Sequence, residues 1–113
     1  MAITVPLNTF KSVAANLTTV NTLLYTAPTE ITSIVLMAQV SNIGASTANA
    51  SFYYKSNTGP MTELVKNFDI PTKDAASMLT GKLVLEQGQS VYAHAGANST
   101  LKIVLSLLET SNQ

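Results

Sequence analysis

The sequence predicts an all-β protein, an antiparallel β-sandwich of jelly-roll-like form with about eight short strands. The first observation behind this prediction is that the apolar residues show almost no helical periodicity. The second is that short apolar or alternating runs recur with Gly, Pro and Asn between them at intervals of about 8–12 residues, a spacing typical of sandwiches and barrels. The third is the chemistry of the breaks, such as Ala27-Pro28-Thr29 and the hairpin dipeptide Gln87-Gly88, which carry residues that favour turns.

Each strand is expected where such a run lies between two breaks. In chain order, the expected strands are Phe10–Leu17, Thr22–Thr26, Ile31–Ser41, Asn49–Lys55, Glu63–Phe68, Lys82–Glu86, Ser90–Ala95 and Leu101–Leu108.

One segment does not fit the strand pattern. Thr72–Leu79 follows Pro71, carries helix formers behind a possible N-cap at Thr72, and is followed by a glycine at position 81. One or two turns of helix and an irregular loop are both compatible with this stretch.

The length of the chain, 113 residues, predicts a single β-sandwich domain over residues 1–113. Residues 1–9 are expected to form an extended N-terminal arm, and residues 110–113 a C-terminal tail.

Charged residues are unusually few. They make up 11% of the chain, whereas soluble domains average about 25%. Six lysines balance six acidic residues and there is no arginine, so the basic patch that nucleic acid or an anionic membrane surface requires is not expected. A weakly charged surface is poorly protected against association. Either the protein is an unremarkable neutral domain, or other protein surfaces cover much of it in its working state; we favour the second interpretation.

Cysteine is absent, which excludes disulfides and thiolate metal sites. The first ten residues lack the pattern of a signal peptide, and the longest apolar runs are far shorter than the ~20 residues of a membrane span. We therefore expect synthesis and folding in a cytoplasm.

Two expected strands depart from clean alternation. One face of each is wholly apolar: Ile34, Leu36, Ala38 and Val40 in the first, and Leu101, Ile103, Leu105 and Leu107 in the second. The second face of a strand in a sheet with one solvated side should be polar, but here it is apolar in part. We interpret the apolar residues of these second faces as candidates for an oligomer or partner interface: Val35, Met37, Val104 and Leu108.

No constellation of catalytic, cofactor-binding or metal-binding residues emerges. The sole histidine, His94, has no nucleophile or orienting carboxylate in a recognisable motif, and the acidic residues have no metal-loop or paired spacing. Phosphate-binding glycine loops are missing. Tyr53 could stack on a sugar, although packing in the sheet or in an interface is the more common role of such a ring. We expect no enzymatic activity, no cofactor and no small-molecule substrate.

Two stretches carry a family resemblance: LLYTAPTEITSIVLMAQVSN (Leu23–Asn42) and ELVKNFDIPTKDAASMLTGKLVLEQGQSVYAHAGANSTLKIVLSLLET (Glu63–Thr110). They resemble small virion structural proteins of tailed bacteriophages, of the head cement or decoration type or the neck and tail accessory type. The resemblance implies a β-sandwich built into a phage particle in many copies, with no active-site residues.

These observations lead to three functional hypotheses. The first is a homo-oligomeric cement or decoration module, by analogy a trimer, whose partners are itself and virion proteins such as the major capsid protein. The second is a neck, tail or fibre-attachment module of the virion. The third, from a different class, is a carbohydrate-binding module, for which Tyr25, Tyr53, Tyr54 and Tyr92 are the available tyrosines.

Overall fold

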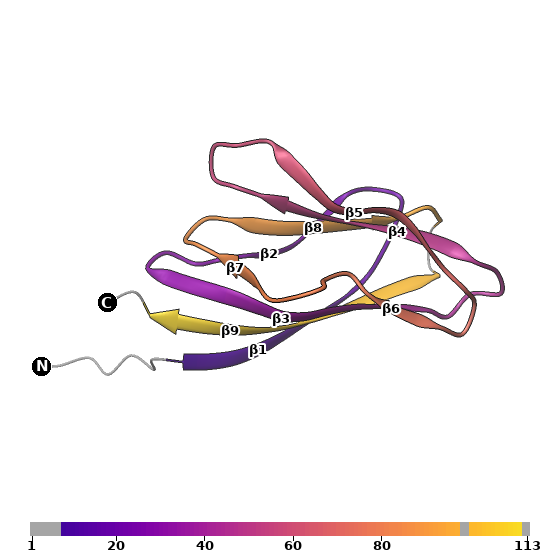
Figure 1. Ribbon diagram of the computed structural model, residues 1–113, viewed down its shortest axis with the longest axis horizontal. Helices are drawn as coiled ribbons and strands as arrows, with labels where there is room; N and C mark the ends of the chain where they lie inside the picture. The colour runs from indigo at the N-terminus through magenta and orange to yellow at the C-terminus, as the bar shows by residue number, and fades with distance from the viewer. Residues whose placement is uncertain (1–7, 98–99, 112–113) are drawn as a thin grey trace, which may run out of the picture.

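The computed structural model describes residues 8–97 and 100–111, and within these ranges the chain forms nine strands and no helix. The strands are β1 (Asn8–Asn16), β2 (Thr22–Thr26), β3 (Ile31–Asn42), β4 (Ala48–Lys55), β5 (Met61–Ile70), β6 (Ala75–Ser77), β7 (Leu83–Leu85), β8 (Ser90–Ala95) and β9 (Leu101–Ser111). They build two antiparallel sheets packed face to face (Figure 1). The all-β, antiparallel sandwich prediction is confirmed.

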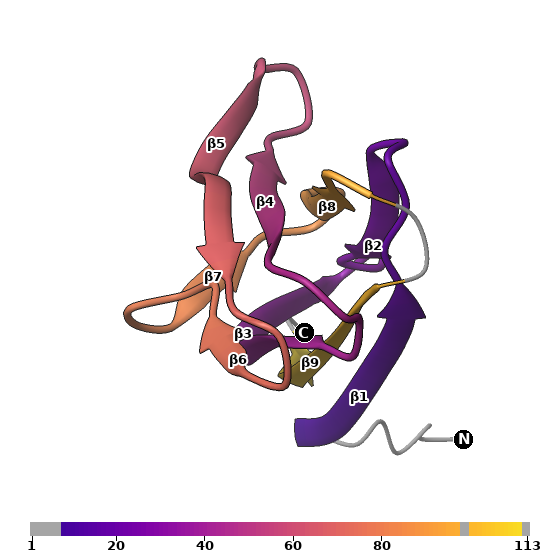
Figure 2. The ribbon, with the colours of Figure 1, turned by 90° about the vertical axis from the view of Figure 1, so that its right-hand side faces the viewer.

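The strand order is that of a jelly roll. Sheet A has the order β1-β9-β3-β6, with β7 also paired to β3, and sheet B has the order β2-β8-β4-β5. Because β6 and β7 both pair with β3, they occupy a single strand position in sheet A. The nine strands therefore fill the eight strand positions of a jelly roll. The chain passes from one sheet to the other after β1, β2, β3, β5, β7 and β8, so each layer contains strands that are distant in sequence (Figure 2).

Most strand bounds agree with the sequence prediction. Thr22–Thr26 and Ser90–Ala95 match at both ends, and the others differ by a few residues, as strand ends usually do. The predicted arm and tail each overlap a strand by two residues, because Asn8 and Thr9 belong to β1 and Thr110 and Ser111 belong to β9. The rest of both segments lies outside the described residues.

The helical alternative for residues 72–79 is wrong. Lys73 has a left-handed backbone with φ 61°, which a continuing helix does not tolerate. The Asp74 side chain then accepts a hydrogen bond from the Ala75 N–H at 2.8 Å, and the chain enters β6, which pairs with β3. Tertiary pairing here overrides the helix propensity of the alanines.

A β-bulge changes the faces of β3. The register with β9 shifts between Val35 and Met37, so Leu36 is an additional residue and the alternation reverses on passing it. Ala38 and Val40 are fully buried as predicted, but Ile34 and Leu36 are half-buried, and Ser33 and Val35 take the core side instead. The predicted register is therefore wrong by one residue in the first half of this strand.

The core lies between the two sheets. Its largest fully buried side chains include Phe52 of β4, Leu17, and the alternate residues of β9 predicted for this role: Leu101, Ile103, Leu105 and Leu107. Phe52 comes from sheet B and the β9 residues from sheet A, so both layers depend on the same apolar contacts. The turn between β7 and β8 contains Gly88, whose φ of 84° favours glycine.

Candidate interaction surface

The side of sheet A that faces away from sheet B carries an apolar row across four strands. Phe10 of β1 lies opposite Leu108 of β9, Leu108 lies opposite Ile34 of β3, and Ile34 lies opposite Val84 of β7. Residues directly opposite in neighbouring strands share a face and contact one another. Phe10 is 75% exposed and Val84 52% exposed, so this row is presented to the surroundings. We call this side of sheet A the outer face.

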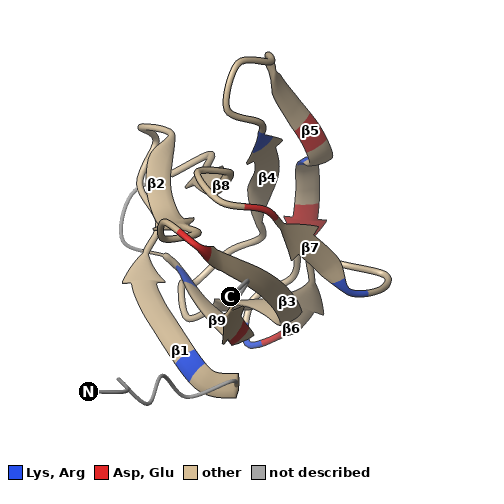
Figure 3. Cartoon of the chain, turned by 90° about the vertical axis from the view of Figure 1, so that its left-hand side faces the viewer, with Lys and Arg blue, Asp and Glu red and all other residues tan. Residues whose placement is uncertain are grey.

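Two further rows extend the outer face along the strands. Met37 lies opposite Ser106, and Gln39 lies opposite Val104, which in turn lies opposite Ala14. Near one end, Lys102 is the one charged side chain that β1, β3 and β9 direct to this side within the described residues. Figure 3 shows how few and scattered the charged positions are on this part of the molecule. A broad, nearly uncharged sheet face with exposed aromatic and aliphatic side chains has the composition of the centre of a protein interface.

The structure separates the four predicted interface residues. Met37, Val104 and Leu108 lie on the outer face, in three successive rows. Val35 does not: its side chain is fully buried between the sheets. The bulge at Leu36 causes this difference, because it turns Val35 inward and leaves Met37 outward. The candidate surface therefore does not include Val35.

Two exposed members of the apolar row are not among the residues predicted from the sequence. Phe10 and Val84 lie at the ends of the row, on β1 and β7. Their strands were expected, but their neighbours across the sheet depend on which strands pair, and a single sequence does not reveal that pairing. Leu83, Val84 and Leu85 form a continuous apolar run, so the sequence carries no alternation that would identify Val84 as the exposed residue of the three.

A polar cluster connects the two sheets beside the apolar row, since Ser33 and Glu109 are the chain neighbours of Ile34 and Leu108. The Tyr25 hydroxyl of β2 lies 2.7 Å from the Ser33 hydroxyl of β3 and donates a hydrogen bond to the Glu109 carboxylate of β9. Glu109 also forms an ion pair with Lys11 at 3.6 Å. Burial and the hydrogen bond to Glu109 raise the pKa of Tyr25 well above its usual value. Because every member has a partner, we interpret this cluster as structural.

Two of the four tyrosines considered for sugar binding, Tyr25 and Tyr53, are engaged within the protein. Tyr25 is buried. The Tyr53 and His94 rings stack with their centroids 5.5 Å apart and an angle of 23° between their planes, so each ring covers one face of the other. Among the described residues, His94 Nδ1 is buried without a hydrogen-bond partner, so no carboxylate orients the ring through this nitrogen. Packing within sheet B accounts for both rings.

The described residues hold no metal-binding cluster. Across residues 8–97 and 100–111, no three His, Cys, Asp or Glu side chains come together in a way that could hold a metal ion. The same residues include no helix of the length and apolarity needed to cross a bilayer.

Comparisons with known proteins relate the chain to others by fold. No protein family model matches it, and no curated protein sequence matches it. Among solved structures, a chain from the acid-stable capsid of Helicobacter pylori bacteriophage KHP30 superposes with a TM-score of 0.58 and 14% identity, covering 96% of this chain and 90% of that one. A chain from the disulfide-linked pili of Bacillus endospore appendages superposes with a TM-score of 0.54 and 12% identity, covering 94% and 88%. At these identities the likeness establishes a shared fold, which is found in a phage capsid and in a pilus.

Proposed function

We propose that the chain is a non-enzymatic structural protein of a tailed-bacteriophage virion, present in many copies as a cement or decoration module that stabilises the capsid shell. The outer face of sheet A is the surface that contacts the shell. The partners are the major capsid protein and further copies of the chain itself, and the location is the virion.

The observation that carries the proposal is the outer face. A soluble protein with one solvated sheet face normally shows polar side chains there, yet this face carries Phe10, Ile34, Val84, Val104 and Leu108 and is nearly without charge. Covering such a face with another protein removes apolar surface from water, which contributes a favourable free energy of roughly 25 cal/mol per Å² buried. An open sheet face suits a broad protein neighbour better than a small ligand, which prefers a concave site.

Two further observations support a virion in particular. The sequence resembles small virion proteins of tailed phages over Leu23–Asn42 and Glu63–Thr110, and the fold is shared with a chain of a phage capsid. The pilus chain shares the fold as well, but this chain lacks the cysteines that disulfide linkage requires.

The test introduces a charge on the outer face. Met37→Lys and Val104→Lys each place an ammonium group that must lose its water at a covered interface without an acidic partner nearby. Binding to capsids prepared without the chain, measured by co-sedimentation, should weaken by roughly tenfold or more, while the β-type circular dichroism stays unchanged. Val20→Lys is the matched control, since Val20 is 69% exposed and lies in the β1–β2 connection away from the outer face.

Two results would contradict the proposal. If both outer-face variants bind capsids as the unaltered chain does, the face is simply solvated. If Val104→Lys, at a position that is 41% exposed, unfolds the chain, the face is part of the core and the contact with the shell lies elsewhere.

A further inference from the structure

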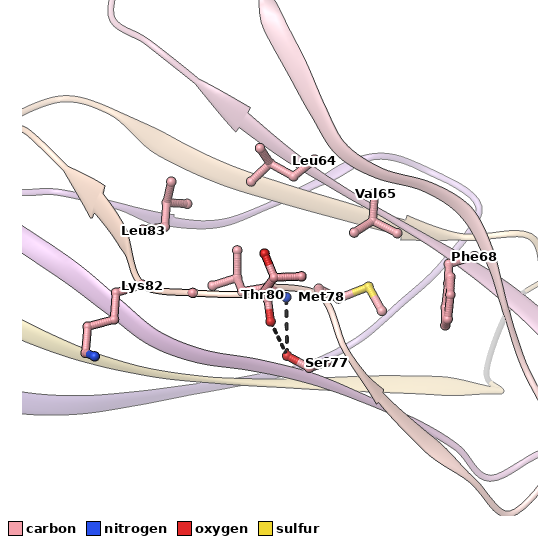
Figure 4. Close-up of a pocket in the computed structure, with 10 residues that line it drawn as sticks. Leu64, Val65, Phe68, Ser77, Met78, Thr80, Lys82 and Leu83 are labelled. Carbon is pink, nitrogen blue, oxygen red and sulfur yellow. Dashed lines mark hydrogen bonds between the residues drawn. The ribbon is translucent and has the colours of Figure 1, made fainter.

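An apolar groove runs along the open edge of the sandwich between β5 and the β6–β7 segment (Figure 4). Its volume is about 440 Å³. The apolar side chains that line it come from both walls: Leu64, Val65, Phe68, Met78, Leu79 and Leu83. Leu64 is 39% exposed and Phe68 49% exposed, so the groove is open to an occupant.

The polar groups in the groove do not suggest a small-molecule site. The Ser77 hydroxyl is engaged with the backbone of its own turn, donating to the Leu79 carbonyl at 2.7 Å and accepting from the Leu79 N–H. Lys82 is the one charged residue of the lining. A ligand site usually combines an apolar lining with several polar groups that converge on the ligand, and this groove offers apolar surface instead.

Both walls of the groove are sheet edges. In the described residues β5 pairs with β4 alone, and β6 and β7 pair with β3 alone, so the sandwich is open on this side. The two register irregularities between β4 and β5 work against a long, regular ladder on the β5 wall. The groove is therefore suited to an extended segment held mainly by its side chains.

We propose that the N-terminal segment of a second copy of this chain, residues 1–7, occupies the groove. In this segment Met1, Ile3, Val5 and Leu7 alternate with Ala2, Thr4 and Pro6, so an extended conformation places the four large apolar side chains on one side. The segment has no charged side chain, which matches the apolar lining. Fully extended, seven residues span about 23–25 Å.

The position of β1 favours a second copy over the same chain. β1 is the edge strand of sheet A farthest from β6, and β5 is the edge strand of sheet B on the groove side. Figure 2 shows β1 and β5 on opposite sides of the molecule. To reach its own groove, the segment would have to turn and cross the width of sheet A, whereas a neighbouring copy can present its own segment directly.

Such a contact joins two different surfaces, and head-to-tail contacts of this kind build rings or open chains of subunits. The inference extends the proposed function by naming how copies contact each other. It depends on the proposed function in one respect, that the chain assembles in many copies. It concerns the groove rather than the outer face. Its test is made in solution without capsids, so its failure is distinct from a failure of shell binding.

The first experiment is sedimentation velocity of the full chain and its variants at micromolar concentration. The unaltered chain should form oligomers. The double variant Ile3→Asp/Val5→Asp and the groove variants Leu64→Asp and Phe68→Asp should sediment as monomers of 11.9 kDa with unchanged circular dichroism. The matched controls should assemble normally: Ala2→Asp/Thr4→Asp puts the same two charges on the other side of the segment, and Val20→Asp puts a single charge at an exposed position away from the groove.

The second experiment mixes two monomeric variants. Ile3→Asp/Val5→Asp keeps a functional groove and Leu64→Asp keeps a functional segment, so together they should form one contact and stop at a heterodimer of twice 11.9 kDa. A mixture that stays monomeric would overturn the proposal. So would an unaltered chain that is monomeric, or segment and groove variants that assemble as the unaltered chain does.

Discussion

Leu105 and Leu36 show how the surroundings of a residue decide its contribution. Leu105 lies in the middle of β9 with a fully buried side chain among core residues of both sheets. Leu36 occupies the bulge of β3, where the strand has one residue more than its partner, and its side chain is half-buried. The two leucines look equivalent in the sequence, since each is central to an apolar run.

Truncation should separate these two positions. Leu105→Ala removes buried methyl groups and leaves a cavity, so it should lower the free energy of unfolding by about 2–5 kcal/mol. Leu36→Ala removes atoms that are already partly in contact with water, and its loss should be clearly smaller. Urea denaturation of both variants measures the difference. Equal losses would mean that Leu36 packs in the core and that the bulge is misplaced.

At the scale of elements, the sequence predicts strands more successfully than their faces. Alternation identifies the buried face of β9 because that strand is regular from Leu101 to Leu107. It fails in β3 because a bulge leaves no mark in the pattern of apolar residues, and Val35 consequently looks like an interface residue although it belongs to the core. The pattern does not reveal β6, because its three residues are held by pairing with a strand distant in sequence rather than by local propensity.

Tyr25 provides a second prediction at this scale, since its hydroxyl connects β2 of one sheet with β3 and β9 of the other. Burial and the hydrogen bond to Glu109 raise its pKa in the folded protein, whereas an unfolded tyrosine ionises near pH 10. The folded state therefore holds the proton more tightly. The protonated Tyr25 hydroxyl therefore contributes to the free energy of unfolding. Its contribution is complete below about pH 10 and is lost as the pH rises toward the pKa of the folded protein.

Tyr25→Phe should accordingly change the pH dependence as well as the stability. At neutral pH the variant should be less stable, because the Glu109 and Ser33 oxygens lose a partner in a largely buried site. Above about pH 10 its free energy of unfolding should fall less steeply than that of the unaltered chain. Urea denaturation from pH 7 to 11 compares the two slopes. If the free energies of unfolding of the two proteins fall with equal slopes, the Tyr25 hydroxyl does not have a raised pKa in the folded protein.

At the scale of the whole molecule, the jelly roll accounts for both the outer face and the groove. Pairing of β1, β9, β3 and β7 brings Phe10, Leu108, Ile34 and Val84 into one row, and the open edge beside β5 leaves a groove. The low charge and the mixed strand faces predict a partner-covered surface, and Met37, Val104 and Leu108 do lie together. The full row and the groove depend on long-range strand pairing, which local patterns do not encode.

In the proposed function, this chain coats a capsid shell through the outer face of sheet A. Electron microscopy of the virion, at a resolution that traces strands, tests it most directly. We expect many copies of the jelly roll on the shell, with Phe10, Met37 and Val104 against another virion protein. A particle without the chain, or one in which this face of every copy is exposed to solvent, would contradict the claim.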